Sequence, residues 1–206
     1  MTTRSKLKTE AAETVNTDSA AKSYNLVVCA YEGTEAQMAK VWKKMTGVDP
    51  AVIAVSATAE LRDILAGIIA RNDVADEFVF VPANCVPCAP LTAAELSTPL
   101  VFVDVNDRRV YGERLPKPFT KEHLVDALAA ESEATTEDWL KNYFKSWLTR
   151  PIEAGFRFGN LVTPVYRSNP CEHVVIEAFV RKKYIFATPG GYAAISALID
   201  QYLLNG

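Results

Sequence analysis

The most constraining feature of this 206-residue sequence is an alternation of two apolar periods between residues 24 and 81. The segments YNLVVCAYE, AVIAVS and EFVFV are continuous apolar runs of strand length. Between them, two segments repeat their apolar residues at helical spacing, one from Met38 to Met45 and one from Leu61 to Ile69. Strands that are apolar throughout are typical of a parallel sheet with helices on both faces.

Helix boundary signals surround several of these segments. Thr34 and Gln37 have the spacing of a capping box at the start of the first helix, and Gly47 predicts its end. Thr92 and Glu95 predict a second capping box, at the start of a short helix. The whole pattern predicts an α/β domain whose mixed sheet is flanked by helices.

The middle of the chain predicts a hairpin followed by helix. Asn106 and Asp107 suit a tight turn between two short strands. The sequence from Thr120 to about Leu148 is helical in two pieces. The second piece carries a stripe of large aromatic residues that belongs either to the core or to an interface: Trp139, Tyr143, Phe144 and Trp147.

The last part predicts a strand, a helix, a second strand and a final helix. The segment FRFGNLVTPVYR is the first strand, and Asn169 caps the helix after it, with Glu172 closing a capping box. YIFAT is the second strand, Pro189–Gly191 form a turn, and an amphipathic helix runs from Tyr192 to Leu204.

Charge and hydropathy exclude several classes of function. The net charge is −3 and the 22 basic residues are scattered, which argues against a nucleic-acid-binding protein. No apolar run approaches the roughly 18 residues that span a bilayer, and the N-terminus lacks the apolar segment of a secretory signal. We therefore expect a protein of the cytoplasm, or of a virion assembled there.

Residues 1–23 form a polar N-terminal tail, and residues 24–206 form a single α/β domain in this interpretation. The tail has few sizeable apolar side chains, too few to compensate for the entropy of ordering it. It is therefore either a flexible leader or an arm that contacts other subunits. In the second case, protein partners or further copies would bind through the tail and the helix that carries Trp139, Tyr143 and Trp147.

The four cysteines are too few for a disulfide scaffold. Cys85 and Cys88 have the spacing of a thioredoxin-like dithiol, which remains an alternative although Asn84 and Pro90 depart from that motif. A zinc site made of Cys85, Cys88, Cys171 and His173 is a second alternative, weakened by the tight C-x-H spacing. Cys29 lies inside a predicted strand, where we expect it to be a small buried hydrophobic residue.

A group of polar residues surrounds the predicted end of the strand in FRFGNLVTPVYR. Open α/β sheets tend to bind ligands at such strand ends, so this group is a candidate binding site. The competing interpretation is a capped helix with a solvated start. The group consists of Asn160, Arg167, Asn169, Glu172 and His173.

Three segments together resemble small glycosyltransferases of the GT-A type from bacteria and their phages, akin to capsular-polysaccharide and Stealth-like transferases. They are YNLVVCAYEG, VADEFVFVPANCVPCAPLTAAEL and GERLPKPFTKEHLVDAL, which agree in order and spacing over roughly residues 24–148. The resemblance implies a GT-A-like fold and a site for a sugar nucleotide near the end of the third strand.

The same resemblance marks what this chain lacks. Ala83 and Asn84 stand where the family places two aspartates that hold a divalent cation. An alanine and an amide do not supply the carboxylate oxygens that Mg²⁺ or Mn²⁺ requires. Glu113 and Arg114 stand where the family has a histidine before Leu-Pro. We therefore expect neither a metal nor another cofactor, with Asn84 among the ligand-binding candidates.

Two functional hypotheses follow from the resemblance. The first is a GT-A-like domain without transferase activity, which serves as a binding or structural module of a larger assembly such as a phage particle. The second is an active transferase that uses a sugar nucleotide without metal. In that case Arg114 or Arg167 clamps the diphosphate, and Glu32 or Glu113 is the base.

Overall fold

The computed structural model describes residues 24–97, 101–103, 109–111, 116–130, 162–168 and 170–206. Its first half contains the predicted alternation of strand and helix. The elements are β1 (Tyr24–Tyr31), α1 (Glu35–Thr46), β2 (Ala51–Val55), α2 (Leu61–Ile69) and β3 (Val74–Val81). The periodicity of the apolar residues was therefore sufficient to locate all five.

The first sheet has the strand order β2-β1-β3-β7, where β7 spans Lys117–Thr120. β1 pairs with β2 and with β3 in parallel, and β7 pairs with β3 antiparallel. The helix α4 (Lys121–Ala130) follows β7 directly. The predicted mixed sheet is thus confirmed.

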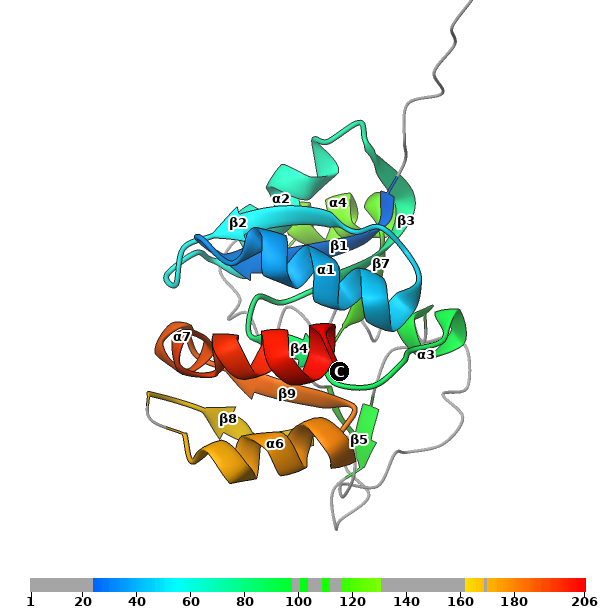
Figure 1. The fold of residues 1–206 in the computed structure, drawn as a ribbon. Helices are drawn as coiled ribbons and strands as arrows, with labels where there is room; N and C mark the ends of the chain where they lie inside the picture. Colours follow the sequence, from blue (N-terminus) through cyan, green and yellow to red (C-terminus); the bar gives the residue numbers. More distant parts are fainter. Residues whose placement is uncertain (1–23, 98–100, 104–108, 112–115, 131–161, 169) are drawn as a thin grey trace, which may run out of the picture.

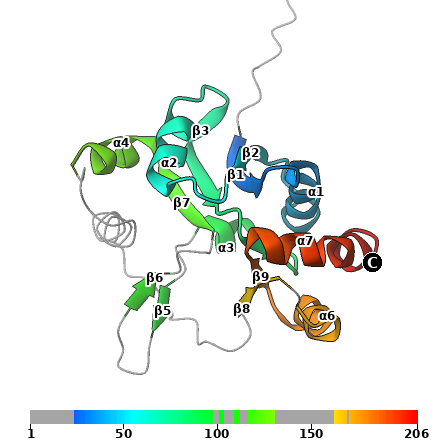
Figure 2. The ribbon, with the colours of Figure 1, turned by 90° about the vertical axis from the view of Figure 1, so that its left-hand side faces the viewer.

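Helices cover both faces of this sheet, as Figure 2 shows with α2 and α4 on one side and α1 on the other. Side chains alternate along β1, so that Val27 and Cys29 join the core under α2 and α4. Val28 and Ala30 join the core under α1. Burial of both faces explains why the strands are apolar throughout.

A second sheet lies beside the first and has the order β4-β9-β8. Its strands are β4 (Cys85–Pro87), β8 (Val162–Tyr166) and β9 (Tyr184–Ala187). Three helical segments accompany it, α6 (Glu172–Arg181), α7 (Pro189–Leu198) and the π-helix η1 (Ile199–Leu204). Figure 1 shows α7 lying between α1 and this second sheet. The buried side chains of α1, β9, α7 and η1 form one apolar cluster.

The capping box predicted at Thr92 is confirmed at the start of α3 (Ala93–Ser97). The backbone N–H of Thr92 donates to Glu95 Oε2, and the N–H of Glu95 donates to Thr92 Oγ1. The predicted hairpin is confirmed as β5 (Val101–Val103) paired antiparallel with β6 (Arg109–Tyr111). Its turn residues Asn106 and Asp107 lie outside the described residues.

The predicted start of α1 is confirmed, since Thr34 is its cap residue and the helix begins at Glu35, but the capping box predicted there is wrong. Thr34 makes no capping bond through its side chain, because its hydroxyl donates to the carbonyl of Tyr31 and Gln37 bonds to distant residues. The helix α6 begins at Glu172 with Cys171 at the cap position, two residues later than a cap at Asn169 predicts, and the box between Asn169 and Glu172 stays a prediction. Asn169 lies outside the described residues.

The predicted turn at Pro189–Gly191 is also wrong, because these residues are the first turn of α7. Thr188 caps the helix by accepting a hydrogen bond from the N–H of Gly191 at 3.2 Å, and Pro189 takes the first helical position. The glycine at 191 has a packing role. A Cβ there would lie 2.2 Å from the carbonyl oxygen of Tyr166.

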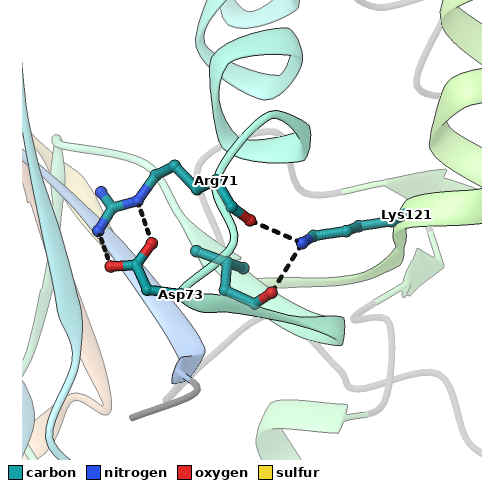
Figure 3. Close-up of polar contacts among 4 residues, drawn as sticks. Arg71, Asp73 and Lys121 are labelled. Atoms are coloured by element: carbon teal, nitrogen blue, oxygen red, sulfur yellow. Dashed lines mark hydrogen bonds and ion pairs between the residues drawn. The ribbon is translucent and has the colours of Figure 1, made fainter. Parts of the chain in front are cut away.

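Lys121 connects the start of α4 to the loop between α2 and β3 (Figure 3). Its Nζ donates to the carbonyl of Arg71 at 2.9 Å and to that of Val74 at 2.7 Å. In the same loop the guanidinium of Arg71 binds both carboxylate oxygens of Asp73, at 2.8 and 2.6 Å. These contacts fix the entrance to β3.

Several predictions fall on residues outside the described part of the chain. These are the tail, Asn160 and the aromatic stripe of Trp139, Tyr143, Phe144 and Trp147. Within the described residues, no helix has both the length and the hydropathy needed to cross a membrane.

Candidate site at the carboxyl ends of β1 and β3

The strand order places a topological switch point between β1 and β3. The chain goes from β1 to β2 on one side of β1, and then to β3 on the other side. In open α/β sheets the crevice outside the carboxyl ends of such strands is the usual ligand site. The residues that follow β1 and β3, Glu32 and Pro82–Asn84, are therefore the first place to look for function.

β3 leaves the sheet before β1 ends. The β1–β3 ladder stops at the pair Val28 and Val81, whereas β1 pairs with β2 as far as Tyr31. After Val81 the chain turns at Ala83–Asn84 and enters β4 of the second sheet. Asn84 thus stands where one sheet passes into the other.

Ala187, at the end of β9, joins the carboxyl ends of the two sheets. Its N–H donates to the carbonyl of Asn84 at 3.0 Å. Its carbonyl accepts a hydrogen bond from the hydroxyl of Tyr31 at 3.3 Å. The ends of β1, β3 and β9 therefore meet around one residue.

The side chain of Asn84 is the unusual polar group of this junction. Its Oδ1 is buried, and it has no hydrogen-bond partner among the described residues. A buried acceptor without a donor destabilises the folded state by about 1–3 kcal/mol. A donor group on a bound molecule would remove that penalty.

The junction does not fit a divalent cation. Ala83 has no side-chain oxygen, and Asn84 offers one neutral amide oxygen where Mg²⁺ or Mn²⁺ takes several hard oxygen ligands. Across the described ranges, no group of three or more His, Cys, Asp and Glu side chains gathers in a way that could hold a metal.

The structure describes some of the other predicted site residues and not others. Glu32 is exposed directly after β1, whereas Glu113 and Arg114 lie outside the described residues. Arg167, Glu172 and His173 are exposed between the end of β8 and the first turn of α6.

Arg167 follows β8, which lies on the other side of β9 from Asn84. The carbonyl of its neighbour Tyr166 accepts a hydrogen bond from the N–H of Thr188 at 2.9 Å. Thr188 follows Ala187, which contacts both Tyr31 and Asn84. The end of β8 therefore lies at the same end of the second sheet as Asn84, with β9 between them.

The four candidate zinc ligands do not come together. Cys85 and Cys88 are buried in the core, at 0% and 8% exposure, whereas Cys171 and His173 are exposed at the start of α6. The second pair is in mutual contact, with Cys171 Sγ 3.1 Å from His173 Nδ1.

The arrangement of Cys85 and Cys88 differs from that of a redox dithiol. The first lies in the strand β4 and the second directly after it, and neither is in a disulfide. Burial raises the pKa of Cys88 to about 12, whereas a reactive dithiol needs a lowered pKa. These thiols are parts of the core.

The sequence did not predict that the side chain of Gln37 joins α1 to α7 and η1. Its Nε2 donates to the carbonyl of Ser196 and to Asp200 Oδ1, at 3.0 and 2.7 Å. Its Oε1 accepts from the hydroxyls of Tyr192 and Ser196, at 2.6 and 3.1 Å. A polar residue beside the apolar stripe of α1 was a signal of such a contact, but its spacing from Thr34 favoured a capping interpretation.

Comparison with known proteins assigns no family to this chain. None of the models of known protein families that were searched matches the sequence, and a search of curated proteins found no significant match.

Proposed function

We propose that this chain is a GT-A-like domain that binds a sugar nucleotide without metal and without transferring the sugar, as a binding module of a larger assembly. The observation that carries the proposal is the turn Ala83–Asn84 at the end of β3. It occupies the switch point of the first sheet, lacks carboxylates, and carries a buried amide oxygen without a partner in the described part of the chain.

The chemistry of the junction supports a ligand rich in hydroxyl and N–H donors. Asn84 Oδ1, an acceptor with no donor among the residues that the structure describes, is suited to a ribose hydroxyl, a sugar hydroxyl or a base N–H group. A domain that binds such a ligand without the metal loses the charge stabilisation that makes transfer fast. Binding without turnover follows from that loss.

Thermal unfolding with millimolar UDP-glucose or GDP-mannose tests the proposal. A ligand that binds the native state raises the Tm, and the rise should be the same with Mn²⁺ as with EDTA. Asn84→Ala should reduce the rise, and Asn72→Ala, at an exposed asparagine of the α2–β3 loop, should leave it unchanged. The absence of any rise with both nucleotides, or a rise that requires Mn²⁺, would contradict the proposal.

An active, metal-independent transferase is the second candidate, and the position of Arg167 favours it. This exposed cation follows β8, at the same end of the second sheet as Asn84. A guanidinium can bind a diphosphate through two parallel hydrogen bonds. Release of nucleoside diphosphate by the wild type in EDTA, lost in Arg167→Ala and strongly reduced in Arg167→Lys, would establish this function and exclude the first.

Assembly is tested separately on the full chain. If the module belongs to a larger assembly, light scattering should show oligomers, or the chain should associate with a partner. A protein that is monomeric, associates with no partner and binds no nucleotide would contradict both parts of the proposal, the binding and the assembly.

A further inference from the structure

A pocket lies at the other end of α1 from the Asn84 junction. It has a volume of about 320 Å³ and is formed where the ends of α1, α6 and η1 meet the segment after β4. Lys44 and Met45 line it from α1, Phe179 and Val180 from α6, and Tyr202 from η1, with Cys88 also in its wall. This volume is at the lower end of the range for ligand-binding pockets.

The wall of the pocket is held by main-chain hydrogen bonds. The N–H of Leu91 donates to the carbonyl of Met45, and the N–H of Cys88 donates to the carbonyl of Lys183, each at 2.8 Å. These bonds attach the segment after β4 to the end of α1 and to the start of β9. The pocket is therefore part of the rigid fold.

Apolar surface extends from the pocket to its rim. Val180 is 81% exposed and Tyr202 is 40% exposed, although both also line the pocket. Scattered exposed hydrophobic residues are ordinary, but these two lie together at the mouth of the pocket and extend its apolar surface beyond the cavity. An occupant that fills only the pocket would leave Val180 in water, so a protein segment fits this surface better than a small molecule does.

The charges around the pocket favour an acidic segment. Lys43, Arg181 and Lys183 are each paired with a carboxylate, on Asp49, Glu177 and Glu95 respectively. Lys44 also lines the pocket, and within the described residues its Nζ contacts the carbonyl of Leu204 rather than a carboxylate. A carboxylate of the occupant would complete this contact.

We infer that this surface binds a segment of a partner protein in which a large apolar side chain is flanked by carboxylates. The apolar side chain enters the pocket, its neighbours cover Val180, and a carboxylate pairs with Lys44. Aromatic and large aliphatic anchors of this kind dominate the energy of protein interfaces. The site is separate from the Asn84 junction, so the two proposals can fail independently.

Fluorescence anisotropy of a labelled peptide tests the inference. The probe contains tryptophan and leucine flanked by glutamates, and its control has lysines in place of the glutamates. The acidic peptide should bind the full-length protein, and the lysine peptide should bind about tenfold more weakly or not at all. Lys44→Glu and Val180→Asp should each weaken binding of the acidic peptide by about tenfold.

Matched variants exclude general effects of charge and folding. Lys40→Glu changes an exposed lysine one turn earlier on α1, and Val125→Asp changes an exposed valine of α4. Both should bind as the wild type does, and circular dichroism should show that all four variants are folded at the assay temperature.

Three results would overturn the inference. They are failure of the acidic peptide to bind, equal binding of the two peptides, and wild-type binding by Lys44→Glu and Val180→Asp. Binding of indole-3-acetate that depends on Lys44, without peptide binding, would assign the pocket to a small molecule instead. Nucleotide binding at the Asn84 junction should be unchanged in Lys44→Glu, which separates the two proposals.

Discussion

The hydroxyl of Tyr192 donates a 2.6 Å hydrogen bond to Oε1 of Gln37, across 155 positions of sequence. Burial raises the pKa of Tyr192, so the hydroxyl keeps its proton and remains a donor. The same amide bonds to Ser196 and Asp200, and thereby connects α1 with α7 and η1. One side chain therefore joins the first sheet's helix to the C-terminal helices.

Gln37→Ala should lower the free energy of unfolding by about 1–3 kcal/mol, because it leaves the partly buried hydroxyls of Tyr192 and Ser196 without this acceptor. Urea denaturation followed by circular dichroism measures the change. Gln201→Ala alters an exposed glutamine of η1 and should stay within about 0.5 kcal/mol of the wild type. Equal losses in the two variants would show that the network contributes nothing.

The hydrogen-bond partners of Gln37 could not be predicted from the sequence. Periodicity located β1, α1, β2, α2 and β3 because each element is defined by residues close together in the chain. The spacing of Thr34 and Gln37 fits a capping box equally well. Only the packing of α7 against α1 decides that Gln37 bonds to residues 155 or more positions away.

The candidate site was predictable in part. The end of the third strand and the start of α6 could be named because ligand sites in α/β sheets follow strand ends. The division into two sheets could not, because β4 pairs with β9 about a hundred residues later. Whether Asn84 Oδ1 finds a partner among the described residues depends on that arrangement, so no local pattern could have revealed that it has none there.

Gly191→Ala should destabilise the protein by about 1–3 kcal/mol, because the new methyl group overlaps backbone atoms. Its Cβ would lie 2.2 Å from the carbonyl oxygen of Tyr166 and 2.7 Å from the carbonyl carbon. Gly67→Ala is the matched control, since Gly67 lies in α2 and, beyond its own helix turn, no described atom lies within 4 Å of an added Cβ. It should stabilise the protein by about 0.5–1 kcal/mol. Urea denaturation should therefore give shifts of opposite sign, and a shared sign would refute the packing argument.

One thiol per chain should react rapidly with Ellman's reagent in the native protein. Cys171 is exposed, whereas Cys29, Cys85 and Cys88 are buried. Burial raises the pKa of Cys29 and of Cys88 to about 12, so neither forms the reactive thiolate at neutral pH. Absorbance at saturation should report one thiol before denaturation and four after it.

Cys171→Ser should remove the fast phase and leave the slow thiols unchanged. A second fast thiol that survives this substitution would show that Cys85 or Cys88 is accessible, as a redox dithiol requires. That result would support the alternative that Cys85 and Cys88 form a redox site.

The ion pair of Arg71 and Asp73 should make stability depend on acid pH (Figure 3). The hydrogen bonds from Arg71 lower the pKa of Asp73 below its unfolded value, which is about 3.9. A lowered folded-state pKa stabilises the protein above the unfolded pKa, and this contribution is lost as the pH falls through the folded pKa. The wild type should therefore lose more stability on acidification than Asp73→Asn does.

Urea denaturation from neutral pH to about pH 3 measures this difference, because that range includes the unfolded pKa of an aspartate. The gap in unfolding free energy between the wild type and Asp73→Asn should narrow as the pH falls. Arg71→Met removes the same hydrogen bonds from the other side and keeps the backbone carbonyl that accepts from Lys121. It should therefore show the same reduced dependence on pH. A constant gap across the range would mean that Asp73 titrates alike in the folded and unfolded chains.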